Sequence, residues 1–183
     1  MGCAVDFTGL QVSYACGTVS SGGLKSVYLV DKADLETNGD LTVSGGAATI
    51  TGTGLVTNGC EVLELGFNNK DGFSNFTDVK TVNADGSASV VPTITMEFLR
   101  MDALKRNALE KIATPGAEIV AFVETAAGTY HVVGLDFGLY AATVDGASGA
   151  ARTDKNRYQL TLAGEENVLA YTMTQTEFGK VNA

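Results

Sequence analysis

The sequence predicts a mostly β protein, a sandwich or barrel of two packed antiparallel sheets with one flanking α-helix. Short segments of alternating apolar and polar residues recur along the chain, as in half-buried strands. Turn residues, including many of the 22 glycines, separate these segments. Only one segment, at about residues 100–113, places apolar residues at helical spacing. The 183 residues show no clear linker, so we expect a single domain over 1–183.

Several strands are expected before the helix. The first covers residues 25–30, and residues 41–56 form a hairpin around the two-residue turn Gly45-Gly46. Another strand is expected at 61–67. The clearest is 89–98, in which Ile94, Met96 and Phe98 share one face while the residues between them share the other.

The expected helix has a recognisable start and stop. Asp102 stands where an acidic side chain caps a helix, and Thr114-Pro115-Gly116 ends the pattern. Its apolar stripe consists of Met101, Leu104, Ala108, Leu109 and Ile112. Alternation then returns, which predicts strands at 118–125, 130–135, 139–144, 158–162 and 168–175.

Three segments are candidates for contacts between copies of the chain. Residues 1–23 form either an N-terminal arm that docks on a neighbour or a frayed terminus. Residues 41–56 carry no charge, and Val43, Ile50 and Leu55 are the apolar residues that we expect at a subunit contact. The loop at 68–88 is the third candidate.

The predicted helix also carries basic residues off its apolar stripe. Lys105, Arg106 and Lys111 form either a solvated outer face or an electrostatic contact with an acidic neighbour. In a chain of net charge −9, the best acidic partner is another copy of the same chain.

Composition argues against several classes of protein. A chain of net charge −9 lacks the clustered cations that bind nucleic acid. Cys3, Cys16 and Cys60 have no zinc-site spacing, and a bridge between Cys3 and Cys16 is left open. The N-terminus has no basic and apolar leader, and no apolar stretch is long enough to span a membrane. We therefore expect synthesis in a reducing cytoplasm.

Catalytic and cofactor motifs are missing from the sequence. The single histidine, His131, lies in an alternating segment, where a packed or surface role is the common one. No nucleophile elbow accompanies it, and the glycines at 52, 54 and 59 lack phosphate-loop spacing. The acidic turn before Gly72 places Phe67 where a calcium ligand belongs. We expect no enzyme activity, no metal and no cofactor.

Three stretches resemble the major tail proteins, or tail tube proteins, of long-tailed phages, with Bacteroidetes as the implied hosts. They are a strand-to-helix unit at 91–98 (VPTITMEF) and 102–109 (DALKRNAL), a hairpin at 119–125 (IVAFVET) and 130–134 (YHVVG), and the segment 148–166 (SGAARTDKNRYQLTLAGEE). The resemblance covers about residues 60–175. It rests on pattern, because such subunits have no active site to mark them.

This resemblance implies a virion structural protein, made in the host cytoplasm, that self-assembles. Six subunits would close a ring, rings would stack with one another and meet other tail proteins, and DNA would pass through the channel without specific binding. The acidic charge fits such a channel, because it repels phosphate. The alternatives are a capsid decoration or head–tail connector protein, and a non-enzymatic binding module.

Overall fold

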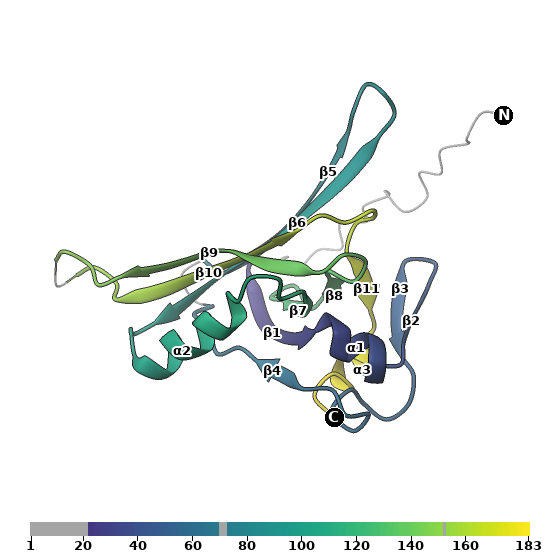
Figure 1. The fold of residues 1–183 in the computed structure, drawn as a ribbon, viewed down its shortest axis with the longest axis horizontal. Helices are drawn as coiled ribbons and strands as arrows, with labels where there is room; N and C mark the ends of the chain where they lie inside the picture. The colour runs from purple at the N-terminus through teal and green to yellow at the C-terminus, as the bar shows by residue number, and fades with distance from the viewer. Residues whose placement is uncertain (1–21, 70–72, 152) are drawn as a thin grey trace, which may run out of the picture.

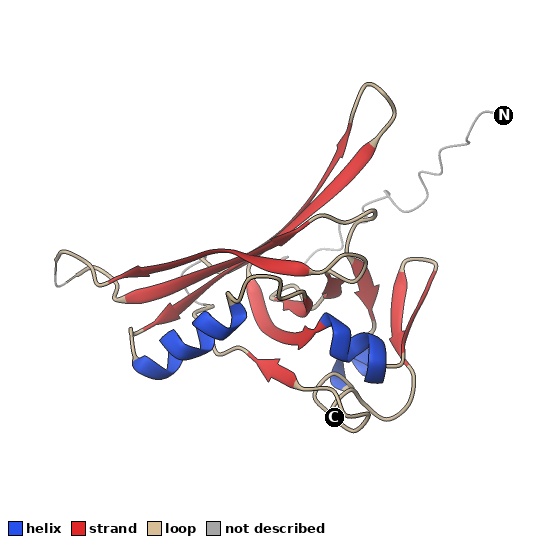
Figure 2. Cartoon of the chain, in the orientation of Figure 1, coloured by secondary structure: helices blue, strands red, loops and turns tan. Residues whose placement is uncertain are grey.

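The computed structural model describes residues 22–69, 73–151 and 153–183 and confirms a mostly β fold (Figure 2). These residues form an 11-stranded sheet and three helices. In chain order the elements are β1 (Leu24–Asp31), α1 (Lys32–Asn38), β2 (Leu41–Ser44), β3 (Ala47–Ile50), β4 (Val62–Glu64), β5 (Asn75–Val82), β6 (Ala88–Leu99), α2 (Ala103–Ile112), β7 (Ile119–Thr125), β8 (Tyr130–Val133), β9 (Leu139–Ala147), β10 (Arg157–Gly164), β11 (Tyr171–Met173) and α3 (Gln175–Gly179).

Nine of the described strands form one hydrogen-bonded path, in the order β2-β3-β11-β8-β7-β9-β10-β6-β5, and β1 and β4 lie off this path. β1 lies on the other side of β7, and β4 pairs with β1. Pairing is antiparallel except between β11 and β3. The sequence predicts two packed sheets. In the structure, β7 on one side of the main core and β9 on the other are joined into one sheet through a single residue pair, Ile119 with Leu139.

A glycine permits the turn at this junction. Gly134 follows β8 with φ +81°, a conformation that favours glycine. A Cβ at this position would lie 2.6 Å from Leu139 Cγ and 2.9 Å from the Ile119 carbonyl oxygen. The chain can therefore leave β8 and re-enter the sheet as β9 only because residue 134 has no side chain.

Two apolar clusters lie on opposite faces of β7. Ile119, Ala121 and Val123 pack with residues of β6, β9, β10 and α2, while Val120 and Phe122 pack with residues of β3 and α3. All residues of β7 except the last are buried. This explains why its sequence is a continuous apolar run and not an alternating one.

Two long hairpins extend away from these clusters. Figure 1 shows β5 and β6 projecting at the upper right and β9 and β10 projecting to the left. The β2–β3 hairpin has the expected turn, with φ values of +60° at Gly45 and +83° at Gly46. Its attachment to the rest of the sheet is the single pair Thr172 with Ala47.

The helices differ in part from the expectation. α2 forms where a flanking helix was predicted, with the Asp102 carboxylate accepting a hydrogen bond from the Lys105 backbone N–H at 2.8 Å. α1 and α3 were not expected. α3 begins inside the segment predicted as a strand over 168–175, of which only Tyr171–Met173 is extended in β11.

Candidate functional site

The most buried charged group in the described structure is Glu97 on β6, which has no exposed surface. Lys155 Nζ lies 3.1 Å from its Oε1, and Arg157 Nη1 lies 2.7 Å from its Oε2. Asn68 also donates to Oε1, at 3.0 Å. Burial opposes ionisation, but these three donors outweigh it and hold the pKa of Glu97 below its ordinary value.

This cluster attaches a loop to the sheet. The Asn68 backbone N–H donates to the Glu97 carbonyl at 2.7 Å, and the Glu97 N–H donates to Ser74 Oγ at 3.2 Å. The Phe73 ring lies 4.0 Å from Lys155 Nζ. Both oxygens of the Glu97 carboxylate thus accept hydrogen bonds from fixed donors. The arrangement is that of a structural contact, with the carboxylate shielded from any reacting molecule.

The other buried carboxylates also connect separate elements. Glu124 on β7 accepts from Lys25 Nζ at 2.6 Å and Ser26 Oγ at 2.9 Å. Glu166 accepts the backbone N–H groups of Asp136 at 2.9 Å and Phe137 at 3.2 Å. Each of the buried carboxylates Glu97, Glu124 and Glu166 is thus held by its own set of hydrogen-bond donors.

His131 on β8 is partly buried, and only one of its two ring nitrogens has a hydrogen-bond partner among the described residues. Its Nε2 lies 3.2 Å from Thr129 Oγ1, and its ring lies 5.7 Å from that of Phe76. Among the described residues its buried Nδ1 has no partner, and neither does Asp78 Oδ1. Burial lowers the pKa of His131, although the Asp78 charge opposes this effect. The carboxylate acceptor at Nδ1 that a catalytic triad requires is therefore missing here.

Within the described ranges, no group of three or more His, Cys, Asp or Glu side chains is placed to hold a metal ion. None of the helices in the described part of the chain is long and apolar enough to cross a membrane.

The three residues that we expected at a subunit contact in the uncharged segment 41–56 differ in their exposure to solvent. Val43 on β2 is 41% exposed and remains available to a neighbour, whereas Ile50 and Leu55 have no exposed surface. They pack in the cluster that contains Phe178 and Val181, which the C-terminal segment supplies. We therefore do not retain Ile50 and Leu55 as subunit contacts, because their side chains already belong to the core.

Two of the three predicted basic contacts are paired within α2. Lys105 forms an ion pair with Asp102, and Arg106 Nη2 lies 3.6 Å from Glu110 Oε1. Lys111 has no ion-pair partner among the described residues and lines a groove beside the helix. The helix thus presents less unpaired positive charge than its sequence suggests.

The segment predicted as a loop at 68–88 is largely regular structure. Residues 70–72 lie outside the described residues, but Asn75–Val82 forms β5, which pairs with β6 alone. β5 is one end of the sheet, and β2 is the other. Val79 is 56% exposed and Val82 is 69% exposed. The sequence did not predict β5, because most of its residues are polar and its few apolar residues do not alternate regularly.

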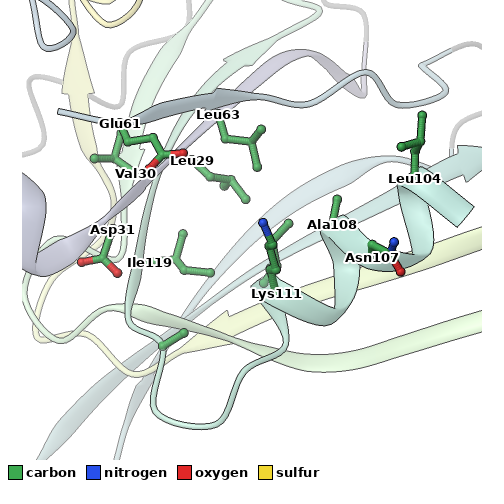
Figure 3. A pocket seen from close by; sticks show the side chains of 12 residues that line it. Leu29, Val30, Asp31, Glu61, Leu63, Leu104, Asn107, Ala108, Lys111 and Ile119 are labelled. Atoms are coloured by element: carbon green, nitrogen blue, oxygen red, sulfur yellow. The ribbon is translucent and has the colours of Figure 1, made fainter.

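A groove of about 540 Å³ lies between α2 and the β1–β4 pair (Figure 3). Leu29, Leu63 and Ile119 line one wall, and Leu104 and Ala108 line the wall on α2. Leu104 is 82% exposed and Leu63 is 43% exposed. The predicted apolar stripe is thereby divided, since Leu109 and Ile112 enter the core while Leu104 and Ala108 line the groove.

The predicted arm at 1–23, with Cys3 and Cys16, falls outside the described residues except for Gly22 and Gly23. Comparisons with known proteins found no relative. No protein-family model matches the chain, and neither does any curated protein or solved structure.

Proposed function

We propose that this chain is a virion structural protein, the subunit of a phage tail tube, that self-assembles into stacked six-membered rings around a channel for DNA. The observation that carries the proposal is the open sheet. β2 and β5 stand at the two ends of one strand path, and each has only one strand partner among the described residues.

Open edges favour pairing with another chain, because their unpaired N–H and C=O groups form hydrogen bonds with an added strand. Two different edges on one subunit produce a head-to-tail contact, and such contacts close into rings when the rotation between subunits allows it. β2 has no charged residue that would oppose pairing. Val79 and Val82 add exposed apolar surface at the opposite edge.

Two further features support the same function. The buried carboxylates Glu97, Glu124 and Glu166 accept hydrogen bonds that link separate parts of the fold, as expected of a structural subunit. The net charge of −9 suits a channel that DNA passes without binding, because like charges repel. The resemblance of residues 60–175 to tail tube proteins selects this function among assemblies of β subunits.

Negative-stain electron microscopy of the concentrated full-length chain tests the proposal. We expect rings with a central channel, or tubes of stacked rings, and no binding of double-stranded DNA in a mobility-shift assay. A protein that stays monomeric at every concentration and salt condition contradicts the proposal. Trimers that bind a capsid lattice would instead favour the decoration or connector class, and a ligand captured by the monomer would favour a binding module.

A further inference from the structure

The cluster at Glu97 places a lysine and a carboxamide on the same buried oxygen atom. Lys155 Nζ lies 3.1 Å from Glu97 Oε1, and Asn68 Nδ2 donates to that oxygen at 3.0 Å. Because both nitrogens contact one atom, they lie no farther apart than these two distances together. Arg157 donates to the other oxygen, Oε2, at 2.7 Å. The carboxylate is thus held with Oε1 facing both the Lys155 amine and the Asn68 amide.

The surroundings of this cluster suit proton transfer. Glu97 has no exposed surface, and burial makes a carboxylate more ready to take up a proton than it is in water. The Phe73 ring lies 4.0 Å from Lys155 Nζ and covers part of the amine. The Lys155 side chain is nevertheless 32% exposed, so a small molecule released beside it can reach solvent.

These three groups are the components of an exchange between two amides. A lysine amine is a nucleophile once it has lost a proton, and an adjacent carboxylate can act as its general base. A carboxamide reacts when its leaving nitrogen gains a proton, and Asn68 presents that nitrogen to Glu97 Oε1. The Arg157 guanidinium keeps its proton and is no nucleophile, so the amine that can react is that of Lys155.

We propose that Lys155 and Asn68 become joined by an intramolecular isopeptide bond, with Glu97 as the proton carrier. The Lys155 ammonium gives a proton to Glu97, and the freed electron pair on Nζ attacks Asn68 Cγ. Glu97 passes the proton to Nδ2, and the Cγ–Nδ2 bond breaks with its electron pair remaining on nitrogen. Nζ then loses a second proton through Glu97 to the departing ammonia. Ammonium leaves, and Glu97 is again a carboxylate.

The bond would fasten two connections of the fold to each other. Asn68 lies between β4 and β5, and Lys155 lies between β9 and β10. A covalent link between such distant residues restricts the unfolded chain, as a disulfide does. The reaction consumes no oxidant, so it can proceed in a reducing compartment where disulfides do not persist. It goes beyond the proposed tube function and does not depend on assembly.

The reaction should be slow, because the resting state is an ion pair. The surrounding donors hold the pKa of Glu97 below its ordinary value, so proton transfer from Lys155 to Glu97 is a rare event. Each chain, however, has to react only once. A freshly folded chain therefore contains the ion pair, and the cross-linked form accumulates as the folded protein is kept.

Mass spectrometry of the intact parent chain, followed over days of incubation at neutral pH, tests the proposal. We expect a growing species that is lighter than the sequence by one molecule of ammonia. A tryptic digest of this species should contain a branched peptide that joins Asn68 to Lys155. Cleavage after Lys155 should be lost, because an acylated lysine is no longer a trypsin site.

Three variants assign the roles. Lys155→Arg keeps the positive charge beside Glu97 but has no reactive amine, so its mass should stay at the value of its sequence. Glu97→Gln should slow formation of the bond by about a hundredfold or more, as expected when a general base is removed. The matched control is Lys25→Arg. Lys25 also pairs with a buried glutamate, Glu124, but that carboxylate has no carboxamide partner in the described structure, and this variant should react as the parent does.

The alternative outcomes are distinct. A parent mass that never falls would overturn the proposal. So would a loss of ammonia that persists in Lys155→Arg, because a cyclic imide formed at an asparagine also releases ammonia but needs no lysine. Formation at the parental rate in Glu97→Gln would overturn the role of Glu97. None of these results bears on rings or tubes in micrographs, so the tube proposal stands or fails separately.

Discussion

At the scale of single residues, Glu97 connects three separate parts of the chain. It links the loop at Asn68 with Lys155 and Arg157 across strands β6 and β10. The Arg157–Glu97 contact lies beside the pair Arg157 with Leu99 in the β6–β10 ladder. Asn68 and Ser74 are therefore attached to the sheet through the carboxylate and the backbone of Glu97.

Replacing Glu97 with Gln should lower the free energy of unfolding by about 2–4 kcal/mol at pH 7, because two partly buried cations lose their counter-charge. Urea unfolding measures the change. Glu110→Gln is the matched control, since that carboxylate is 69% exposed and its loss should cost less than about 0.5 kcal/mol. Equal effects of the two substitutions would contradict the assigned role of Glu97.

The stabilities of the parent chain and of Glu97→Gln should depend differently on pH. The pKa of Glu97 is lower in the folded chain than in the unfolded one, so its contribution is present above the unfolded value of about 4.3. It is lost as the pH falls through the lower folded pKa. The stability difference between the parent and Glu97→Gln should therefore shrink in acid. A difference that stays constant from pH 7 to pH 3 would mean that ionisation plays no part.

At the scale of elements, the sequence predicted the helices and strands that are marked by nearby residues, such as a cap, a stop or an alternating pattern. α2 has its cap at Asp102 and its stop at residues 114–116, and β6 alternates apolar and polar residues from Thr93 to Phe98. α1, with 7 residues, and α3, with 5, are too short to show a helical stripe. Their formation depends on contacts with distant residues, such as the hydrogen bond from the Ile50 N–H to Glu177 at 2.8 Å.

Burial was predicted less well than element type, because a pattern shows which residues share a face and not what covers that face. Glu97 was assigned to the polar face of its strand, and its contact with Asn68 could not be seen in the alternation. Ile50 and Leu55 were assigned to a surface that the C-terminal segment in fact covers. The open edges of β2 and β5 likewise follow from strand order, which local patterns do not contain.

The β5 edge gives a prediction for an element. Val79→Lys adds a charge on an exposed edge strand, where lysine opposes pairing with another chain. The substitution should change the free energy of unfolding by less than about 0.5 kcal/mol. It should abolish rings and tubes in electron micrographs. Val168→Lys, at a valine that is 40% exposed outside the strands, is the control and should still assemble. Assembly of both variants would remove β5 from the interface.

At the scale of the whole molecule, the net charge of −9 makes copies of the chain repel one another. The basic residues of α2 do little to offset this repulsion between copies. Lys105 and Arg106 already pair with Asp102 and Glu110 in the same helix. In the assembly that we propose, apolar and main-chain contacts at β5 and β2 supply the attraction, and neither kind of contact weakens when salt screens charge.

Assembly should therefore become easier as salt is added. Repulsion between exposed charges extends about 30 Å at 0.01 M salt and about 8 Å at 0.15 M. We expect the concentration needed for sedimentable tubes to fall at least about threefold between these conditions. The double substitution Lys105→Gln, Arg106→Gln takes the net charge from −9 to −9 − 2 = −11 and should steepen this salt dependence. If copies instead met through the basic helix, salt would weaken assembly and the double variant would lose it at every salt concentration.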